Sequence, residues 1–142
     1  MRLDSIEVVT LFVDDIDAAK AFYKRVFAPD IVYQDDVSAV FKFSGVMINL
    51  LDATQAPQLI APSTVAPSGS GSRALFTIKV DDTDAVCAEL DRRGVTLLNG
   101  PVDRPWGRRT AAFADPSGHV WEVAQELGQA IMAQTGDVTH RK

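Results

Sequence analysis

The spacing of hydrophobic residues changes near the start of the chain, and this change predicts a strand followed by an amphipathic helix. VVTLFV (8–13) is almost continuously apolar, whereas DDIDAAKAFYKRVF (14–27) places apolar residues three and four positions apart. Asp14 and Asp17 mark the expected helix start, where a capping side chain and a first-turn carboxylate both stabilise exposed amides. We therefore predict a strand over 8–13 and a helix capped at Asp14.

Three short segments rich in β-branched and aromatic residues follow this helix. They are IVYQD (31–35), SAVFKFS (38–44) and VMINLLD (46–52), and Ser44-Gly45 between the last two is a plausible tight turn. The order predicts a βαβββ module over residues 5–52. Residues 53–73 are rich in Ala, Pro, Ser and Gly. Their apolar residues follow neither the helical nor the strand period, so we expect a linker there.

The same order of patterns returns in the second half of the chain. Asp81 and Asp84 stand 67 residues after the first aspartate pair, and Gly94 is suited to end the second helix in a left-handed conformation. The sequence Asp115-Pro116-Ser117-Gly118 predicts a turn before the last strand. The expected strands are ALFTIKV (74–80), VTLLN (95–99), TAAFA (110–114) and HVWEVAQ (119–125). A second βαβββ module is thus predicted over 74–127, followed by a tail over 128–142.

Length and composition limit the class of protein. A chain of 142 residues with 46% hydrophobic content is expected to form one α+β domain. Its net charge of -5 argues against nucleic-acid or anionic-membrane partners. Neither a signal peptide nor an apolar run of about 20 residues is present, so we expect a cytoplasmic protein. The lone Cys87 excludes an internal disulfide.

The repeated segments resemble the vicinal oxygen chelate superfamily, which includes glyoxalases, bleomycin-resistance proteins and extradiol dioxygenases. The resemblance rests on VVTLFVDDIDAAKAFYKRVF (8–27), FTIKVDDTDAV (76–86) with LDRRGV (90–95), and GPVDRPWGRRTAAFADPSGHVWEV (100–123). It implies two βαβββ modules whose sheets curl into half-barrels around a shared cavity, commonly in a homodimer.

Alternation along the strands assigns side chains to faces independently of the resemblance. In the first strand, one face carries Val9, Leu11 and Val13, and the other carries Val8, Thr10 and Phe12. In the last strand, Glu122 shares a face with Val120 and Ala124, opposite Trp121 and Val123. Glu122 is therefore expected to point into the cavity.

The resemblance also implies where metal ligands lie in the metal-dependent members, namely in the first and last strands of each module. Those positions are Val8, Asn49, Leu75 and Glu122 in this sequence. Glu122 alone is a strong ligand, and Asn49 offers a neutral amide oxygen, whereas a divalent cation needs several such donors. We therefore predict no metal and no cofactor, with a divalent metal ion as the alternative.

The two histidines are not expected to complete a metal site. His119 lies three positions from Glu122 and so on the opposite face, where we interpret it as an exposed turn residue. A register shift of one residue near the turn would bring it to the cavity face. His140 belongs to the tail.

Three roles remain open for Glu122, because an unpaired buried carboxylate is costly. It is a structural acid hydrogen-bonded to Asn49 or Thr77, or it binds a cationic or donor-rich ligand, or it acts as a general base.

The segment GPVDRPWGRR (100–109) is interpreted as a loop near the cavity. Trp106 lies between Pro105 and Gly107. It either covers a flat ligand or packs as a hydrophobic side chain against the sheet or a dimer partner. The three arginines Arg104, Arg108 and Arg109 form either an anion site or a solvated cluster that balances an acidic surface.

The sequence therefore favours a metal-free small-molecule-binding protein of the bleomycin-resistance kind, which sequesters an aromatic or cationic ligand and so serves antibiotic resistance. The expected ligand contacts are Phe12, Asn49, Trp106 and Glu122, and the expected cavity lining is Val8, Thr10, Leu75 and Thr77. The alternatives are a glyoxalase- or dioxygenase-like lyase, isomerase or oxidoreductase, and a module used only for protein association. Whether the protein is an enzyme stays open.

Overall fold

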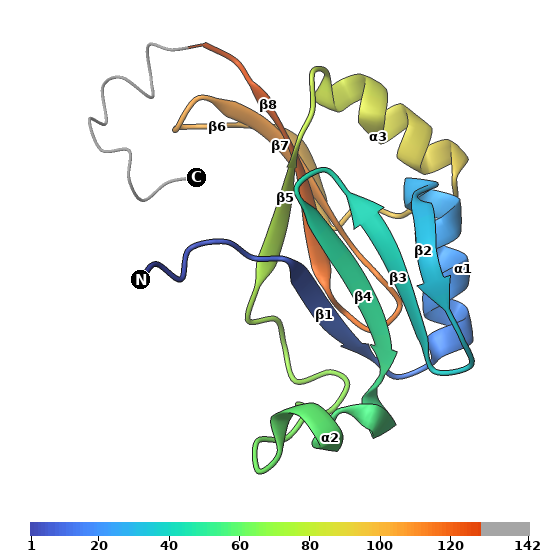
Figure 1. The fold of residues 1–142 in the computed structure, drawn as a ribbon. Coiled ribbons are helices and arrows are strands. Elements are labelled where there is room, and N and C mark those ends of the chain that lie inside the picture. The colour runs from blue at the N-terminus through green and yellow to red at the C-terminus, as the bar shows by residue number, and fades with distance from the viewer. Residues whose placement is uncertain (129–142) are drawn as a thin grey trace. The chain divides into compact units, whose positions relative to one another are not determined.

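The computed structural model describes residues 1–128 of the chain. Their contacts group them into two compact units. The first unit holds residues 1–71 together with 115–119, and the second holds residues 72–114 and the described residues from 120 on. Each unit contains one four-stranded sheet (Figure 1), with strand order β1-β4-β3-β2 in the first and β5-β8-β7-β6 in the second. The α+β class and the repeated four-stranded module are thus confirmed.

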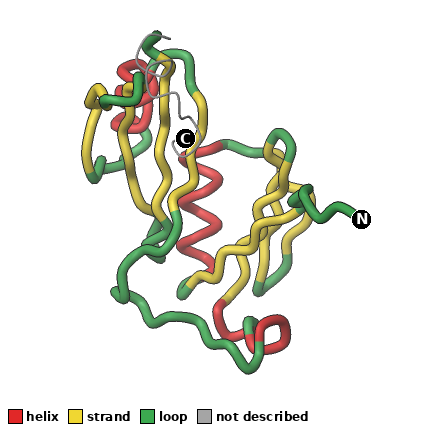
Figure 2. Tube along the Cα trace, turned by 90° about the vertical axis from the view of Figure 1, so that its left-hand side faces the viewer, coloured by secondary structure: helices red, strands yellow, loops and turns green. Residues whose placement is uncertain are grey.

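The first unit follows the predicted order of elements. Its elements are β1 (Val8–Val13), α1 (Ile16–Phe27), β2 (Asp30–Gln34), β3 (Ser38–Phe43) and β4 (Val46–Asp52). The outer strand β1 pairs in parallel with β4, and β3 pairs antiparallel with both β4 and β2. Figure 2 shows α1 lying along one face of this sheet.

Helix α1 is held by a cap at its start and an aromatic cluster beneath it. The capping residue is Asp15, one position later than predicted, and its carboxylate accepts a hydrogen bond from the Ala18 amide at 3.0 Å. Asp14 instead donates its backbone N–H to the Ser117 hydroxyl. Tyr23, which has no exposed surface, stacks on Phe41 of β3. This contact fixes the helix against the sheet.

The predicted turn at Asp115-Pro116-Ser117-Gly118 packs with the first unit, although it connects two strands of the second. Asp115 is 5% exposed, and one of its oxygens accepts the backbone N–H groups of Ser117 and His119, both at 2.9 Å. Its other oxygen accepts the Tyr23 hydroxyl at 2.7 Å. The aspartate therefore joins the turn to α1.

Asp35 organises the connection from β2 to β3. Its carboxylate accepts hydrogen bonds from the Tyr33 hydroxyl at 2.7 Å, the Val37 amide at 3.0 Å and the Ser38 hydroxyl at 2.9 Å. These bonds, that of Tyr33 first, lower the pKa of Asp35 to about 2. All of them favour the charged form of the carboxylate.

The low pKa of Asp35 predicts a loss of stability in acid. Because the folded pKa lies below the unfolded value of about 4, the contribution is complete above that value and is lost as the pH falls towards about 2. Carbon-detected NMR titration of the Asp35 carboxyl measures this directly. Tyr33→Phe should move the midpoint upward towards the ordinary range, and an unchanged midpoint would contradict the assignment of Tyr33 as the main cause.

The second unit repeats the arrangement. Its elements are β5 (Leu75–Lys79), α3 (Thr83–Arg92), β6 (Asn99–Arg104), β7 (Arg108–Ala114) and β8 (Val120–Glu126). Helix α3 contacts β6, β7 and β8. Its cap is Asp82, again one residue later than the predicted aspartate, and Gly94 takes the expected left-handed conformation (φ +82°) just beyond the helix end.

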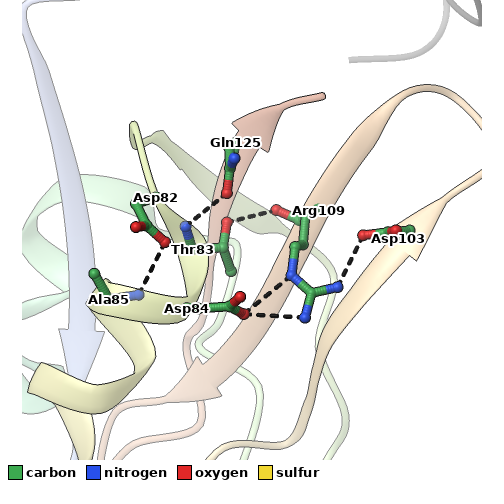
Figure 3. Close-up of polar contacts among 7 residues, drawn as sticks. All are labelled: Asp82, Thr83, Asp84, Ala85, Asp103, Arg109 and Gln125. Atoms are coloured by element: carbon green, nitrogen blue, oxygen red, sulfur yellow. Dashed lines mark hydrogen bonds and ion pairs between the residues drawn. The ribbon is translucent and has the colours of Figure 1, made fainter. Parts of the chain in front are cut away.

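A polar network ties the start of α3 to its sheet (Figure 3). Buried Thr83 donates its backbone N–H to Gln125 and its hydroxyl to the Arg109 carbonyl, at 2.9 and 2.7 Å. The Arg109 guanidinium bridges Asp103 and Asp84 at 2.8 and 3.0 Å. The hydrogen bonds that the guanidinium donates, first to Asp103 and then to Asp84, raise the pKa of Arg109.

One expectation about the connections is wrong, and another gains detail. The strand predicted at 95–99 is β6 at Asn99–Arg104, so most of the predicted loop 100–109 is strand and only residues 105–107 form the turn. Its pairing with β7, which includes Arg104 opposite Arg108, overrides its poor strand propensity. The predicted linker 53–73 contains two short helices, η1 (Ala53–Gln55) and α2 (Pro57–Ile60). No helix within residues 1–128 is long and apolar enough to cross a membrane.

Candidate functional site

A carboxylate and a hydroxyl occupy the middle of the second sheet, on the face away from α3. Thr77 of β5 and Glu122 of β8 are directly paired, and the Thr77 hydroxyl donates to one Glu122 oxygen at 2.8 Å. Glu122 is 9% exposed. Within residues 1–128 its second oxygen accepts no hydrogen bond. Alternation thus places Glu122 on the face of β8 opposite Trp121 and Val123, and its hydrogen-bond partner is Thr77 rather than Asn49.

The first sheet carries a neutral counterpart of this pair. Thr10 of β1 is paired with Asn49 of β4, and the Asn49 amide nitrogen donates to the Thr10 hydroxyl at 3.3 Å. The Asn49 side-chain oxygen is buried and has no hydrogen-bond partner among the described residues. A ligand or water that donates a hydrogen bond would satisfy this oxygen. The repeat thus places Asn49 and Glu122 at equivalent points, each beside a threonine of the first strand of its module.

The other predicted lining residues lie on the same two faces but farther from these pairs. Val8 and Leu75 stand at the first positions of β1 and β5, where they are 38% and 47% exposed. Their partners in register are Met47 and Val120, which stand two residues before Asn49 and Glu122 on the same strands. Phe12 is half-buried and shares the face of Thr10.

His119 is not an exposed turn residue. It is half-buried, and its Nε2 donates a hydrogen bond to the Phe12 carbonyl oxygen at 2.8 Å. This bond occupies the nitrogen that faces the end of β1, so His119 serves as a link between the turn and the first sheet. His140 lies outside the described residues.

The three arginines of the former loop do not form one cluster, because strand alternation separates them. Arg109 faces α3, while Arg104 and Arg108 share the opposite face with Glu122. Arg108 forms an ion pair with Glu126 at 3.0 Å. Arg104 bonds to neutral oxygens only, at Thr110 and Asn99. Arg108 and Arg109 therefore balance acidic residues, as one of the two interpretations expected, but on opposite faces of the sheet.

Trp106 lies in the tight turn between β6 and β7, as predicted. Gly107 closes this turn by donating its backbone N–H to the Arg104 carbonyl at 3.0 Å, and its φ of +87° is one that glycine adopts readily. The indole is half-buried. It is thus fixed at one end of the β6–β7 hairpin.

The donor set does not fit a divalent metal. Within residues 1–128, no group of three or more His, Cys, Asp or Glu side chains is placed to hold an ion. In the second unit, Thr77 and Glu122 offer one hydroxyl and one carboxylate, and Glu126 on the same face is neutralised by Arg108. In the first unit, Thr10 and Asn49 offer one hydroxyl and one amide. Structural and catalytic metal sites use three or more strong donors.

Comparison with known proteins identifies the fold family. The family model of the Glyoxalase/Bleomycin resistance protein/Dioxygenase superfamily matches residues 5–123. The chain belongs to this superfamily. A glyoxalase/bleomycin resistance protein/dioxygenase from Nocardioides superposes with a TM-score of 0.80 at 24% identity, over 91% of each chain.

Two further similar proteins bear names that describe a function. TnmS3, an antibiotic binding protein from Streptomyces sp. CB03234, is 28% identical with a TM-score of 0.66, over 89% of this chain and 98% of TnmS3. Metallothiol transferase FosB of Lysinibacillus sphaericus is 25% identical over 122 residues, which are 86% of this chain and 82% of FosB. The proteins similar to this chain thus include one described as an antibiotic binding protein and one named as a transferase.

Proposed function

We propose that the protein binds a small aromatic molecule carrying a cationic or hydrogen-bond-donating group, and that Glu122 receives this group. The observation that carries the proposal is the state of Glu122. The residue is 9% exposed, yet the described residues give its carboxylate one hydroxyl donor and no cation. A buried carboxylate is stable only with a counter-charge or several donors. A bound cation would supply what the protein does not.

Binding without chemistry is the form of the proposal that we favour, since TnmS3 is described as an antibiotic binding protein. Sequestration of this kind would protect a cell from a toxic compound. We also infer a homodimer, because the edge strand β2 leaves Ile31, Val32 and Tyr33 exposed by 40%, 54% and 55%. A cytoplasmic location is part of the same proposal.

Replacing Glu122 by glutamine tests the proposal. Calorimetric titration with a panel of aromatic amines should find binders with Kd below the millimolar range, and Glu122→Gln should weaken them by about 10- to 100-fold. The amide keeps the size of the side chain and its acceptor for Thr77, so the loss reports the charge. Glu7→Gln, an exposed glutamate just before β1, is the matched control and should bind as the wild type does.

Two results would contradict the proposal. One is a panel in which every amine binds more weakly than millimolar, and the other is a Glu122→Gln protein that binds as tightly as the wild type. Elemental analysis distinguishes metal-free binding from the metalloenzyme alternative, which the name of FosB suggests. We expect protein purified without added metal to contain well under one equivalent, and near-stoichiometric Fe, Mn, Ni or Zn would favour the enzyme.

A further inference from the structure

Arg104 differs from the other arginines of its hairpin in having no acidic partner. Its Nε donates to the Thr110 hydroxyl at 2.9 Å, and its Nη2 donates to the Asn99 side-chain oxygen at 3.1 Å. Within residues 1–128, no carboxylate lies within ion-pair distance of this guanidinium. Two neutral acceptors use two of its five N–H groups and leave its charge uncompensated.

The guanidinium extends along the sheet face that carries Glu122. Asn99 is paired with Ala112, and Ala112 is paired with Glu122, so these three residues lie in one row across β6, β7 and β8. Because the Arg104 guanidinium bonds to Asn99, it lies near this row of residues. Asn99 is on β6 and Glu122 is on β8, so two strand spacings separate the guanidinium from the carboxylate. Two strand spacings correspond to about 10 Å. The residue between them is an alanine, whose methyl group projects little from the sheet.

The two charges are therefore held on one face without neutralising each other. Each is fixed by neutral hydroxyl or amide groups, Arg104 by Thr110 and Asn99, and Glu122 by Thr77. An arginine that served only to neutralise the carboxylate would pair with it directly, as Arg108 pairs with Glu126. A separation of this size instead matches a molecule that lies along the row and carries opposite charges at its two ends.

We propose that the ligand of this site is amphoteric, with a cationic or donor group for Glu122 and an anionic group, such as a carboxylate or phosphonate, for Arg104. This inference rests on the proposed function, because it assumes that Glu122 receives the cationic end. Arg104 then determines specificity by favouring amphoteric molecules over simple amines. The exposed Lys79, on the same face and without a hydrogen-bond or ion-pair partner in the described chain, adds to the positive potential there.

Three probes with the same ring separate the two charges. Benzylamine carries the cation, benzoate the anion, and 4-(aminomethyl)benzoate both. NMR shift titrations up to about 10 mM suit the weak binding of such small molecules. The wild type should bind 4-(aminomethyl)benzoate about tenfold more tightly than benzylamine, with shifts at the amides of Ala112 and Glu122.

Arginine variants test the assignment of the anionic end. Arg104→Met should abolish the preference for 4-(aminomethyl)benzoate over benzylamine, and Arg104→Lys should restore part of it. This ratio compares two probes on one protein, so a general loss of stability does not change it. Arg92→Met, on the exposed face of α3, is the matched control and should keep the wild-type preference.

The outcomes distinguish this inference from the proposed function. If benzylamine binds in a Glu122-dependent way but 4-(aminomethyl)benzoate binds no tighter, or if Arg104→Met keeps the preference, the amphoteric ligand is wrong and the proposed function stands. If Glu122→Gln weakens neither amine, or if no probe shifts the amides of Ala112 and Glu122, both are wrong.

Discussion

Asp115→Ala is expected to lower the free energy of unfolding by about 3–5 kcal/mol, because it removes the acceptor of three hydrogen bonds at a buried position. The Tyr23 hydroxyl and the amides of Ser117 and His119 all donate to this carboxylate. Tyr23 has no exposed surface, so water cannot replace the lost acceptor. Urea unfolding followed by circular dichroism measures the change.

A pair of tyrosine variants checks that burial is the reason for this large effect. Tyr23→Phe and Tyr33→Phe each delete a hydroxyl that donates to an aspartate at 2.7 Å, the first to buried Asp115 and the second to exposed Asp35. Tyr23→Phe should cost about 1–2 kcal/mol, and Tyr33→Phe should cost clearly less, because water can reach the exposed Asp35 carboxylate. Equal costs, or an Asp115→Ala protein as stable as the wild type, would contradict the assigned role of the turn.

Gly100→Ala is expected to destabilise the protein by about 3–5 kcal/mol, through backbone strain and steric overlap together. Gly100 has a φ of +90°, and a Cβ there would overlap the Thr110 carbonyl oxygen and lie 2.7 Å from the Ala111 Cα. These are backbone atoms of β7, which cannot move aside without disturbing the sheet. Thermal and urea unfolding of the purified variant measure the loss.

Gly45→Ala is the matched control for this substitution. Gly45 has a similar φ of +84°, but a Cβ there would meet no atom within 4 Å. It should therefore show the conformational cost alone, about 1–2 kcal/mol. If the two alanine variants lost the same stability, the close approach of β6 to β7 at Gly100 would be contradicted.

The repeated pattern made most of the fold predictable from sequence. Each long helix and most strands show a spacing of apolar residues that is typical of their secondary structure. The first helix begins at Ile16, within two residues of its predicted start, and the last strand presents Glu122 on the predicted face. Thr77, which bonds to Glu122, was one of the two hydrogen-bond partners expected from the sequence. These features depend on local spacing, which a single sequence displays.

Features that depend on pairing between distant segments were not predictable in the same way. Strand β6 has the composition of a loop, with Gly100 and Pro101 inside it, and it forms because β7 lies beside it. A sequence analysis that does not predict β6 therefore cannot predict that Arg104 lies on the face of Glu122 and Arg109 on the opposite face. The role of His119 likewise depends on the distant Phe12 carbonyl.

The most direct test of the central claim is a crystal structure of the protein with the tightest-binding aromatic amine of the panel. We predict that the amine nitrogen lies about 3 Å from a Glu122 carboxylate oxygen, on the face of the sheet that carries Thr77. An amine bound elsewhere, or a metal ion coordinated by Glu122, would contradict the account.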